Sequence, residues 1–388
     1  MSYQYENHKR ALVIGAGSGR DIASAILIAE ELREQGIEFD IAGFLTPFAV
    51  HTFAGEMEHP VNRLELPSKK YLFGAQEISG FYFEPELPGL FEEFSIDVGN
   101  IYLLSLHYGT ERLRQDLAQL IEKNNYDLIL AVDIGGDILT TKQLLPELLN
   151  PIVDLACLEV LATCDTDIDM HLIEIAPGAD GEFGPDNLRI LLNRHKVLRQ
   201  ERIDRNSNGY RRYRTLNEEI GVRTSSQSNT FRLIDEINGS EIKGPIQQKI
   251  MKYFGKLDRV EKCSFDITLD AELMRSIYYY DLREVYERNG LTYRFDNVLD
   301  SHKKIRQLGA LSTEVDLTYL PTETPDNAKR AFTATLGEQL PPDVRTELIV
   351  NSLIFVKATE NVERILVSEQ DRELVEKYIK VGVEIDYI

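Results

Sequence analysis

The stretch ALVIGAGSGRD, residues 11–21, carries the strongest fold signal in the sequence. Its apolar run 11–14 is typical of a buried strand, and the amphipathic stretch 22–32 predicts a helix that ends before Gly36. Glycines in such a turn allow close backbone approach, and a helix N-terminus attracts anions. We therefore expect a loop that binds phosphate or carboxylate, formed by Gly15, Gly17, Ser18, Gly19, Arg20 and Asp21.

Apolar strand patterns and amphipathic helix patterns keep alternating from this unit to residue 200. Continuously apolar strands joined by crossover helices are typical of a parallel sheet with helices on both faces. The sequence thus predicts an α/β fold with a Rossmann-like, doubly wound, mainly parallel sheet over residues 8–200. Further strands are expected at 39–45, 101–106, 127–132 and 171–175, with helices at 111–122, 143–161 (interrupted at Pro151) and 185–198. The Pro-, Gly- and Phe-rich stretch 55–100 is expected to be an insertion that could act as a lid.

The remaining chain divides into three predicted parts. Residues 201–244 contain the clusters SNG, SSQSN and NGS, which predict loops and hence a polar connecting segment. Residues 245–330 are expected to form a C-terminal α+β extension, and 331–388 an extra strand and helix segment. Within this extension we predict helices at 246–254, 273–289 and 301–308, and strands at 265–269 and 313–317.

Composition excludes several classes of protein. The chain has 388 residues, and its 43 Lys and Arg against 64 Asp and Glu give a formal net charge of −21. Such a charge repels duplex nucleic acid and anionic membranes, so we expect neither as a partner. The three cysteines show no CxxC spacing, and no apolar run is long enough to span a bilayer. These features predict a reduced, cytoplasmic protein.

The sequence of the glycine loop does not identify a single ligand. Its spacing is GxGxG rather than GxGxxG, and no acid follows the strand 39–45, so dinucleotide binding is disfavoured. GAGSGRD also resembles the first motif of S-adenosylmethionine-dependent methyltransferases, whose strand usually has an acid where this sequence has Val13. S-adenosylmethionine is therefore an alternative cofactor, and a tight turn without a ligand is a third interpretation.

Two acidic glycine loops follow later predicted strands, DIGGD at 133–137 and GADGE at 178–182. Because the carboxyl ends of parallel strands share one edge of a sheet, these loops should meet the first loop in one crevice. Carboxylates there could exchange protons or hold Mg²⁺, whereas Asp residues in turns can also serve only as caps. The catalytic candidates are Asp133, Asp137, Asp180 and Glu182, and the metal candidates are Asp137 and Asp180.

A resemblance to a known family rests on five segments in a fixed order. They are GAGSGRD at 15–21, DIGGD at 133–137, LLNPIVDLACLEVLA at 148–162, PGADGE at 177–182 and LSTEVD at 311–316. Together they are similar to a prokaryotic family known only as domain of unknown function 1152, over residues 11 to about 320. The resemblance implies a Rossmann-like α/β fold and a shared site around Asp21, Asp133, Asp137, Asp180 and Glu182, but no reaction. The family usually has glycine where Ser18 and Arg20 stand, and Ser-Pro in place of Asn150-Pro151.

Three acidic or basic residues outside these loops are weaker candidates. His107 stands at a predicted strand tip, where it could transfer a proton or bind phosphate, although a histidine in a turn is more often structural. Glu314 and Asp316 alternate with apolar residues, as surface carboxylates of a strand do.

The segment 189–214 is basic and contains Tyr210 and Tyr213. It could hold RNA or a phosphorylated ligand, but a helix face that pairs with neighbouring acids is the favoured interpretation. The triple tyrosine 278–280 lies in a helical pattern and predicts packing or an oligomer contact.

These patterns favour an enzyme that binds a phosphate-bearing small molecule, a nucleotide or a sugar phosphate, at the carboxyl edge of the sheet. Hydrolysis or group transfer would use carboxylate acid/base catalysis with Mg²⁺ as the expected cofactor. No GxSxG elbow and no P-loop occur in the sequence, which disfavours serine-hydrolase and P-loop kinase chemistry. The alternatives are methyl transfer and a non-catalytic sensor or assembly protein, and a homo-oligomer is expected.

Overall fold

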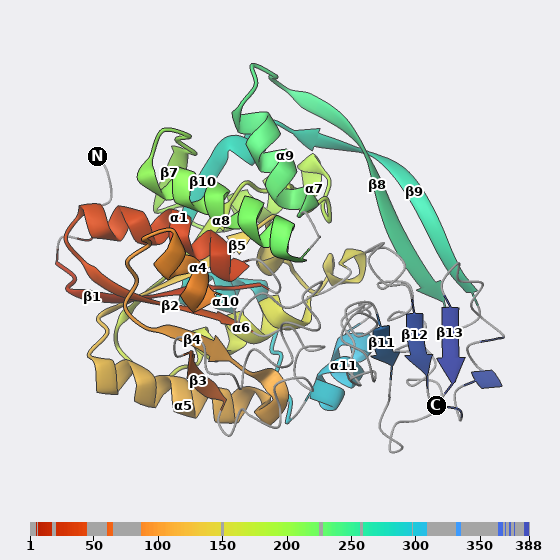
Figure 1. Ribbon diagram of the computed structural model, residues 1–388, viewed down its shortest axis with the longest axis horizontal. Coiled ribbons are helices and arrows are strands. Elements are labelled where there is room, and N and C mark those ends of the chain that lie inside the picture. The colour runs from red at the N-terminus through yellow and green to blue at the C-terminus, as the bar shows by residue number, and fades with distance from the viewer. Residues whose placement is uncertain are drawn as a thin grey trace.

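The centre of the protein is an eight-stranded sheet with helices on both faces (Figure 1). The computed structural model describes residues 5, 7–17, 21–44, 60–64, 87–148, 151–224, 228–256, 259–296, 298–308, 331–334, 364–367, 369, 372–373, 376 and 384–387. In spatial order the strands are β3 (Val61–Leu64), β4 (Ile101–Leu104), β2 (Glu38–Phe44), β1 (Arg10–Gly15), β5 (Leu128–Ile134), β6 (Asp169–Ile175), β10 (Ser276–Asp281) and β7 (Arg199–Arg202).

The inner strands form a doubly wound parallel sheet. Strands β4, β2, β1, β5 and β6 are parallel, whereas β3 pairs with β4 and β10 pairs with both β6 and β7 in the antiparallel sense. The chain winds outward from β1 in one direction through β2 and β4, and in the other through β5 and β6. This is the strand order of a Rossmann-like fold, and the winding reverses between β1 and β5. The predicted α/β fold class is confirmed.

Two apolar cores cover the two faces of the sheet because successive strand side chains alternate. In β1, Ala11 and Val13 face one core while Leu12 and Ile14 face the other. The first core packs against α1 (Asp21–Glu34), α4 (Leu87–Glu93), α8 (Asn208–Thr224) and α9 (Asn229–Asn238). The second packs against α5 (Gly109–Asn124), α6 (Ile152–Ala162), α7 (Pro185–Arg194), α10 (Leu282–Asn289) and α11 (Val298–Gln307). In the described part of the chain both faces are covered by helices, so the carboxyl ends of the strands are the expected place for a ligand.

Two helix predictions in the C-terminal half are wrong. Residues 246–254 lie in β8 (Pro245–Lys256), which pairs with β9 (Arg259–Asp270) as a long antiparallel ribbon that extends from the sheet (Figure 1). Ile246, Ile250 and Phe254 are four residues apart in the sequence. This spacing fits one face of a helix, but it also fits one face of a strand, where residues an even number of positions apart lie on the same side.

The prediction of one helix over 273–289 is also wrong in its first half. The stretch contains the 3₁₀ turn η6 (Leu273–Arg275) and β10, and only α10 is helical as predicted. The triple tyrosine lies in β10, with Tyr279 in one core and Tyr278 and Tyr280 in the other. These rings therefore pack inside the fold as strand residues, so the predicted helical pattern is corrected.

The loops predicted for 201–244 are largely helical. This segment forms the end of β7 and then α8 and α9. Helix α8 lies so close to α1 that a side chain at Gly209 would collide with the carbonyl oxygen of Leu27. The main sheet, through β7 and β10, thus extends beyond residue 200. The predicted helix 143–161 is reduced to α6, preceded by the 3₁₀ turn η5 (Leu145–Glu147).

Other predictions agree with the structure or fall outside it. The helix predicted at 301–308 corresponds to α11, and the strand at 265–269 lies in β9. Near the C-terminus, β11 (Ala331–Ala334), β12 (Arg364–Val367) and β13 (Glu384–Tyr387) form a small parallel sheet. The predicted strand 313–317 and most of the insertion 55–100 lie outside the described residues. Among the described helices, none combines the length and apolar character needed to span a bilayer.

Candidate functional site

Three loops lie side by side where β1, β5 and β6 end. The amide of Ala16, just after β1, donates to the carbonyl of Val132 in β5 at 2.7 Å. The amide of Gly135, just after β5, donates to Ile175 at the end of β6 at 3.2 Å, and the amide of Gly178 donates back to Gly135 at 2.6 Å. These hydrogen bonds hold the three glycine loops together at the carboxyl edge, beside the point where the winding reverses.

A cavity of about 310 Å³ opens at this edge, and six carboxyl groups line it. Three of them stand at or near the start of helical turns: Asp21 in α1, Asp137 in the 3₁₀ turn η4 (Asp137–Leu139), and Asp154 in α6. Asp133 comes from β5, and Asp180 and Glu182 come from the loop after β6. Among the described residues, the lining contains no Lys or Arg. The cavity therefore has a strongly negative wall, and only helix N-termini offset it locally.

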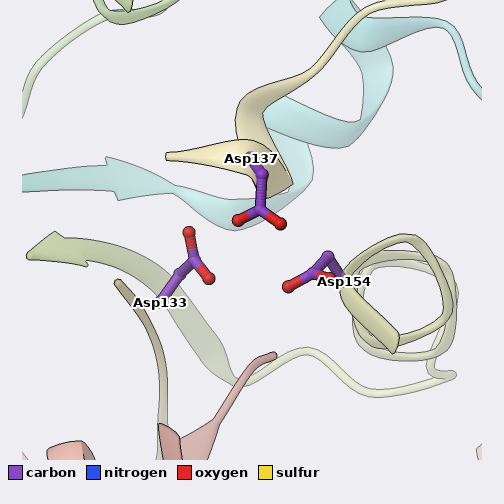
Figure 2. Close-up of side chains that lie close together, drawn as sticks. All are labelled: Asp133, Asp137 and Asp154. Carbon is purple, nitrogen blue, oxygen red and sulfur yellow. The ribbon is translucent and has the colours of Figure 1, made fainter. Parts of the chain in front are cut away.

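Three of these carboxylates converge on one point. Figure 2 shows the side chains of Asp133, Asp137 and Asp154 directed toward one another from β5, η4 and α6. One oxygen of each lies within 4.8 Å of an oxygen of the other two. Oxygen ligands of Mg²⁺ or Ca²⁺ lie about 2.0–2.6 Å from the ion, so two such ligands are at most about 5 Å apart. The spacing of the three carboxylates is thus that of ligands to one hard cation.

The carboxylate of Asp133 is buried, and hydrogen bonds from the backbone reach only part of it. It is 1% exposed, and the backbone amides of Gly136 and Ile138 donate to its carboxylate. Its Oδ2 atom is buried without a backbone donor, and the neighbouring side chain placed to hydrogen-bond the carboxylate is that of another acid, Glu174. A buried carboxylate oxygen without a donor is costly, and a bound cation is one way to compensate it.

The glycines of two loops make room for carboxylates. A side chain at Gly17 would begin 2.4 Å from Asp21 Oδ2 and 2.8 Å from Asp154 Oδ1. Gly135 has a positive φ of 117°, and a side chain there would meet the carboxyl group of Asp180 at 2.4 Å. Glycine is therefore required at both positions for the acids to approach the backbone so closely.

Burial and mutual repulsion raise the pKa values of the acids at this site. Burial, with Asp133 and Asp180 nearby, raises the pKa of Asp21 well above its usual range. Burial and then the charge of Asp154 do the same to the pKa of Asp137. Behind the cavity, Glu174 on β6 pairs in register with Asp133, and burial beside Asp133 raises its pKa strongly. Without a cation, burial and mutual repulsion thus disfavour the ionisation of all these groups together.

The structure brings most of the predicted site residues together. Asp133, Asp137, Asp180 and Glu182 all line the cavity with Asp21, while Gly15 and Gly17 form its described loop. Of the two predicted metal ligands, Asp137 belongs to the converging group, and Asp180 lies elsewhere on the same wall. Ser18, Gly19, Arg20, Glu314 and Asp316 lie outside the described residues. His107 lies in the 3₁₀ turn η3 (Leu106–Tyr108), and its side chain is outside the described part.

Sequence reasoning missed two acids, Asp154 and Glu174. Asp154 stands in a helix whose neighbours are almost all apolar and buried, and Glu174 stands in a strand that is buried from Met170 to Ile175. An acid inside an otherwise apolar run is itself a signal, because carboxylates are rarely buried unless something compensates them.

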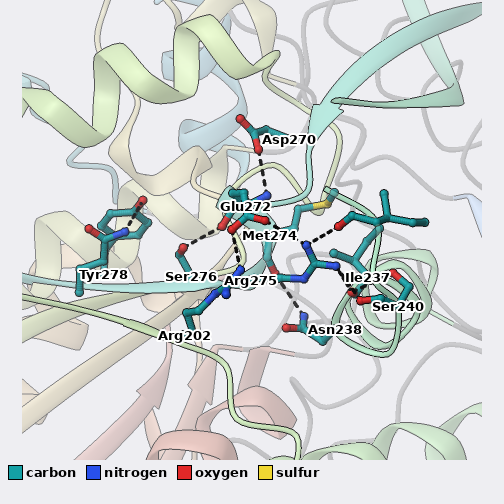
Figure 3. Close-up of polar contacts among 12 residues, drawn as sticks. Arg202, Ile237, Asn238, Ser240, Asp270, Glu272, Met274, Arg275, Ser276 and Tyr278 are labelled. Atoms are coloured by element: carbon teal, nitrogen blue, oxygen red, sulfur yellow. Dashed lines mark hydrogen bonds and ion pairs between the residues drawn. The ribbon is translucent and has the colours of Figure 1, made fainter. Parts of the chain in front are cut away.

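The second wall of the cavity is formed by α8 and α9. Tyr213 and Asn217 of α8 line it, together with Ser228, Thr230 and Phe231 around the start of α9. The other end of α9 is fixed by Arg275, whose guanidinium donates to the carbonyls of Ile237, Ser240 and Ile242 (Figure 3). This anchoring fixes the C-terminal end of α9, and the cavity is lined by residues around its N-terminal end.

The basic segment 189–214 pairs with acids of the same chain. Arg199 contacts Glu31 at 2.7 Å, Arg205 contacts Asp235 at 2.9 Å, and Arg212 pairs with Glu30. Tyr210 and Tyr213 are buried in the core, so neither ring is an exposed stacking surface. These contacts agree with the favoured interpretation of an ion-paired surface.

Comparison with known families adds one finding. The family model described as a protein of unknown function, DUF1152, matches residues 87–219. The predicted resemblance is confirmed there. The matched part contains five of the six cavity acids, all except Asp21, and also Tyr213 and Asn217. No curated protein matches the sequence. The family description names no activity, so function must be argued from the cavity.

Proposed function

We propose that the protein is an enzyme that binds a divalent cation, such as Mg²⁺, and acts on a phosphate-bearing small molecule in the acidic cavity. The observation that carries the proposal is the convergence of Asp133, Asp137 and Asp154, together with the burial of the Asp133 carboxylate beside a further acid, Glu174. Hydroxyl- and carboxylate-type oxygens are the ligands that Mg²⁺, Mn²⁺ and Ca²⁺ prefer.

The charge of the cavity explains why a cation is needed. A phosphate that approached six carboxyl groups without any described Lys or Arg would be repelled. A bound divalent cation offsets part of this local charge and offers open coordination positions to phosphate oxygens, as in many phosphoryl-transfer sites. The cation, rather than the backbone of the glycine loop alone, is then the group that attracts the phosphate.

The remaining acids supply proton transfer. In hydrolysis, a water oxygen forms a bond to phosphorus, the bond from phosphorus to the ester oxygen breaks, and that oxygen receives a proton. Asp21, Asp180 and Glu182 line the cavity outside the converging group, so one of them can take the proton from water or give it to the leaving oxygen. In group transfer, a hydroxyl of an acceptor molecule replaces the water.

Mn²⁺ binding tests the proposal directly, because Mn²⁺ replaces Mg²⁺ and is visible by electron paramagnetic resonance. We expect the protein to bind Mn²⁺, and Asp154→Asn to weaken that binding by about 100-fold or more, since even residues behind a metal ligand are typically worth 10–100-fold. The matched control is Asp186→Asn in α7, whose side chain is 98% exposed and lies outside the cavity.

Two results would overturn the proposal. The first is a wild-type protein that binds no Mn²⁺, and the second is equal Mn²⁺ affinity in Asp154→Asn and Asp186→Asn. Activity is then assayed as release of inorganic phosphate from a panel of phosphate esters with Mg²⁺, with Asp154→Asn expected to be inactive. Tight ligand binding without any turnover would favour the sensor alternative.

Methyl transfer is retained as a second candidate because of one observation. The sulfonium of S-adenosylmethionine is positively charged, and the described lining of the cavity is acidic. Binding of S-adenosylmethionine in the presence of a chelator, and its displacement by S-adenosylhomocysteine, would favour this alternative over the cation-dependent enzyme.

A further inference from the structure

We infer that the ligand of this cavity is a monosaccharide phosphate rather than a nucleotide. The inference rests on the proposed function and narrows its substrate class. Three features of the cavity carry it: its size, the hydrogen-bonding groups of its walls, and the absence of a described surface on which a base could stack.

The cavity is small for a nucleotide. At about 310 Å³ it lies at the lower end of the range of small-molecule sites, about 300–1,000 Å³. Part of this volume must hold the cation and the phosphate beside Asp133, Asp137 and Asp154. The enclosed space that remains is of the order of one sugar ring, so the base of a nucleotide would have to extend beyond the described walls.

The walls favour a ligand with many hydroxyl groups. Carboxylates accept hydrogen bonds and do not donate them, so a ligand that contacts Asp21, Asp180 or Glu182 must bring donors. The other polar lining groups are the hydroxyls of Ser24, Tyr213, Ser228 and Thr230 and the amide of Asn217. Ser228 Oγ accepts from the Phe231 amide, and the hydroxyl retains its proton for a further hydrogen bond. Asn217 donates to the Tyr213 carbonyl through Nδ2, and its amide oxygen is an acceptor. A sugar offers donors and acceptors around its whole ring and thus matches both kinds of wall.

The two aromatic side chains of the lining are buried and pack against each other in the core. Tyr213 and Phe231 are 2% and 8% exposed, and their rings meet edge to face at a centroid distance of 5.5 Å. Tyr213 also packs against Tyr210. Neither ring offers a free face to a nucleobase, whose recognition usually relies on such stacking.

Calorimetric titration of the Mn²⁺-loaded protein with ribose 5-phosphate, glucose 6-phosphate and AMP tests the inference. We expect at least one sugar phosphate to bind about tenfold or more tightly than AMP. Thr230→Val keeps the side-chain shape but removes a lining hydroxyl, and it should weaken sugar-phosphate binding by up to about tenfold. Mn²⁺ affinity should stay unchanged. The control is Thr215→Val, which removes a hydroxyl from α8 that bonds to the Arg211 carbonyl and lies outside the cavity lining.

The outcomes separate this inference from the proposed function. AMP binding as tightly as both sugar phosphates overturns the inference and leaves the cation site intact, and so does failure of both sugar phosphates to bind the Mn²⁺-loaded protein. Equal effects of Thr230→Val and Thr215→Val also count against it. Failure of Mn²⁺ itself to bind overturns the proposed function and the inference together.

Discussion

Two buried aspartates at opposite ends of the same sheet differ in how their charge is compensated. Asp40 in β2 and Asp133 in β5 are both 1% exposed. Asp40, at the amino end, accepts hydrogen bonds from the Arg10 guanidinium at 3.0 Å, from the amide of Asn100 at 2.5 Å and from the Tyr126 hydroxyl. Asp133, at the carboxyl end, has other acids as its side-chain neighbours: Glu174, Asp137 and Asp154.

The difference separates a structural acid from a binding acid. All partners that Asp40 needs are supplied by the chain, so it contributes to stability without any ligand. The group around Asp133 gathers like charges in a cavity, which lowers the stability of the protein unless protons or a cation compensate them. Burial alone therefore does not reveal a site, whereas burial without compensation does.

The largest effect is expected when the compensated acid is removed. Asp40→Ala leaves the buried Tyr126 hydroxyl and the partly exposed Arg10 guanidinium without their shared partner. Hydrogen bonds to a charged group typically contribute about 1.5–3 kcal/mol each, so losing them together should cost about 3–5 kcal/mol. We expect a loss of unfolding free energy of this size in urea titrations, with Mn²⁺ affinity unchanged when measured under folded conditions. A loss below about 1 kcal/mol would mean that Asp40 is not the structural acid of the comparison.

The second effect is stabilisation of the folded protein by a cation bound at the carboxyl end of the sheet, beside Asp133. Mn²⁺ at 100 times its dissociation constant should raise the unfolding free energy of the wild type by about 2.7 kcal/mol. Asp133→Asn removes a ligand and should abolish this gain, while the exposed Asp186→Asn should retain it. Equal gains in unfolding free energy in all three proteins would show that the cation binds elsewhere, and Asp133 would then not be a binding acid.

The third effect is a gain in stability when one acid of the group is neutralised. In EDTA, Asp137→Asn should be more stable than the wild type by about 1 kcal/mol at neutral pH, because a buried repulsive charge is lost. Since burial raises the pKa of Asp137 in the folded state, the folded protein holds this proton longer than the unfolded chain. The wild type should therefore lose stability as the pH rises above about 4, where an unfolded Asp ionises.

That difference is measured by comparing urea unfolding of the two proteins across pH. The stability advantage of Asp137→Asn should be smallest near pH 4 and grow toward pH 7. An advantage that shrinks as the pH rises has the wrong sign and would show that Asp137 is stabilised, rather than strained, by its surroundings.

The sequence predicted the sheet and much of its acidic edge, and the reasons are local. The parallel strands are mostly apolar and buried, and each of the three loops follows such a strand with glycines and acids, so their place at one edge follows from topology. Asp154 could not be placed in the same way, because it comes from a helix whose packing against the loops is a tertiary fact. The strand β8 was missed because its apolar spacing suits two structures, and β10 because it runs directly into α10.

The smallest effect is expected on the exposed, ion-paired surface. Arg214 in α8 contacts Glu218 at 2.8 Å, but both side chains are about half exposed. Such a pair one helical turn apart typically contributes about 0.3–0.5 kcal/mol and is weakened by salt. Arg214→Gln should therefore change the unfolding free energy by no more than about 0.5 kcal/mol. A loss above about 1 kcal/mol, or a change in Mn²⁺ affinity, would couple this surface to the cavity wall that α8 forms. If Arg214→Gln changes neither the unfolding free energy nor the Mn²⁺ affinity, the contrast holds: the buried acids affect stability and binding, whereas this exposed ion pair affects neither.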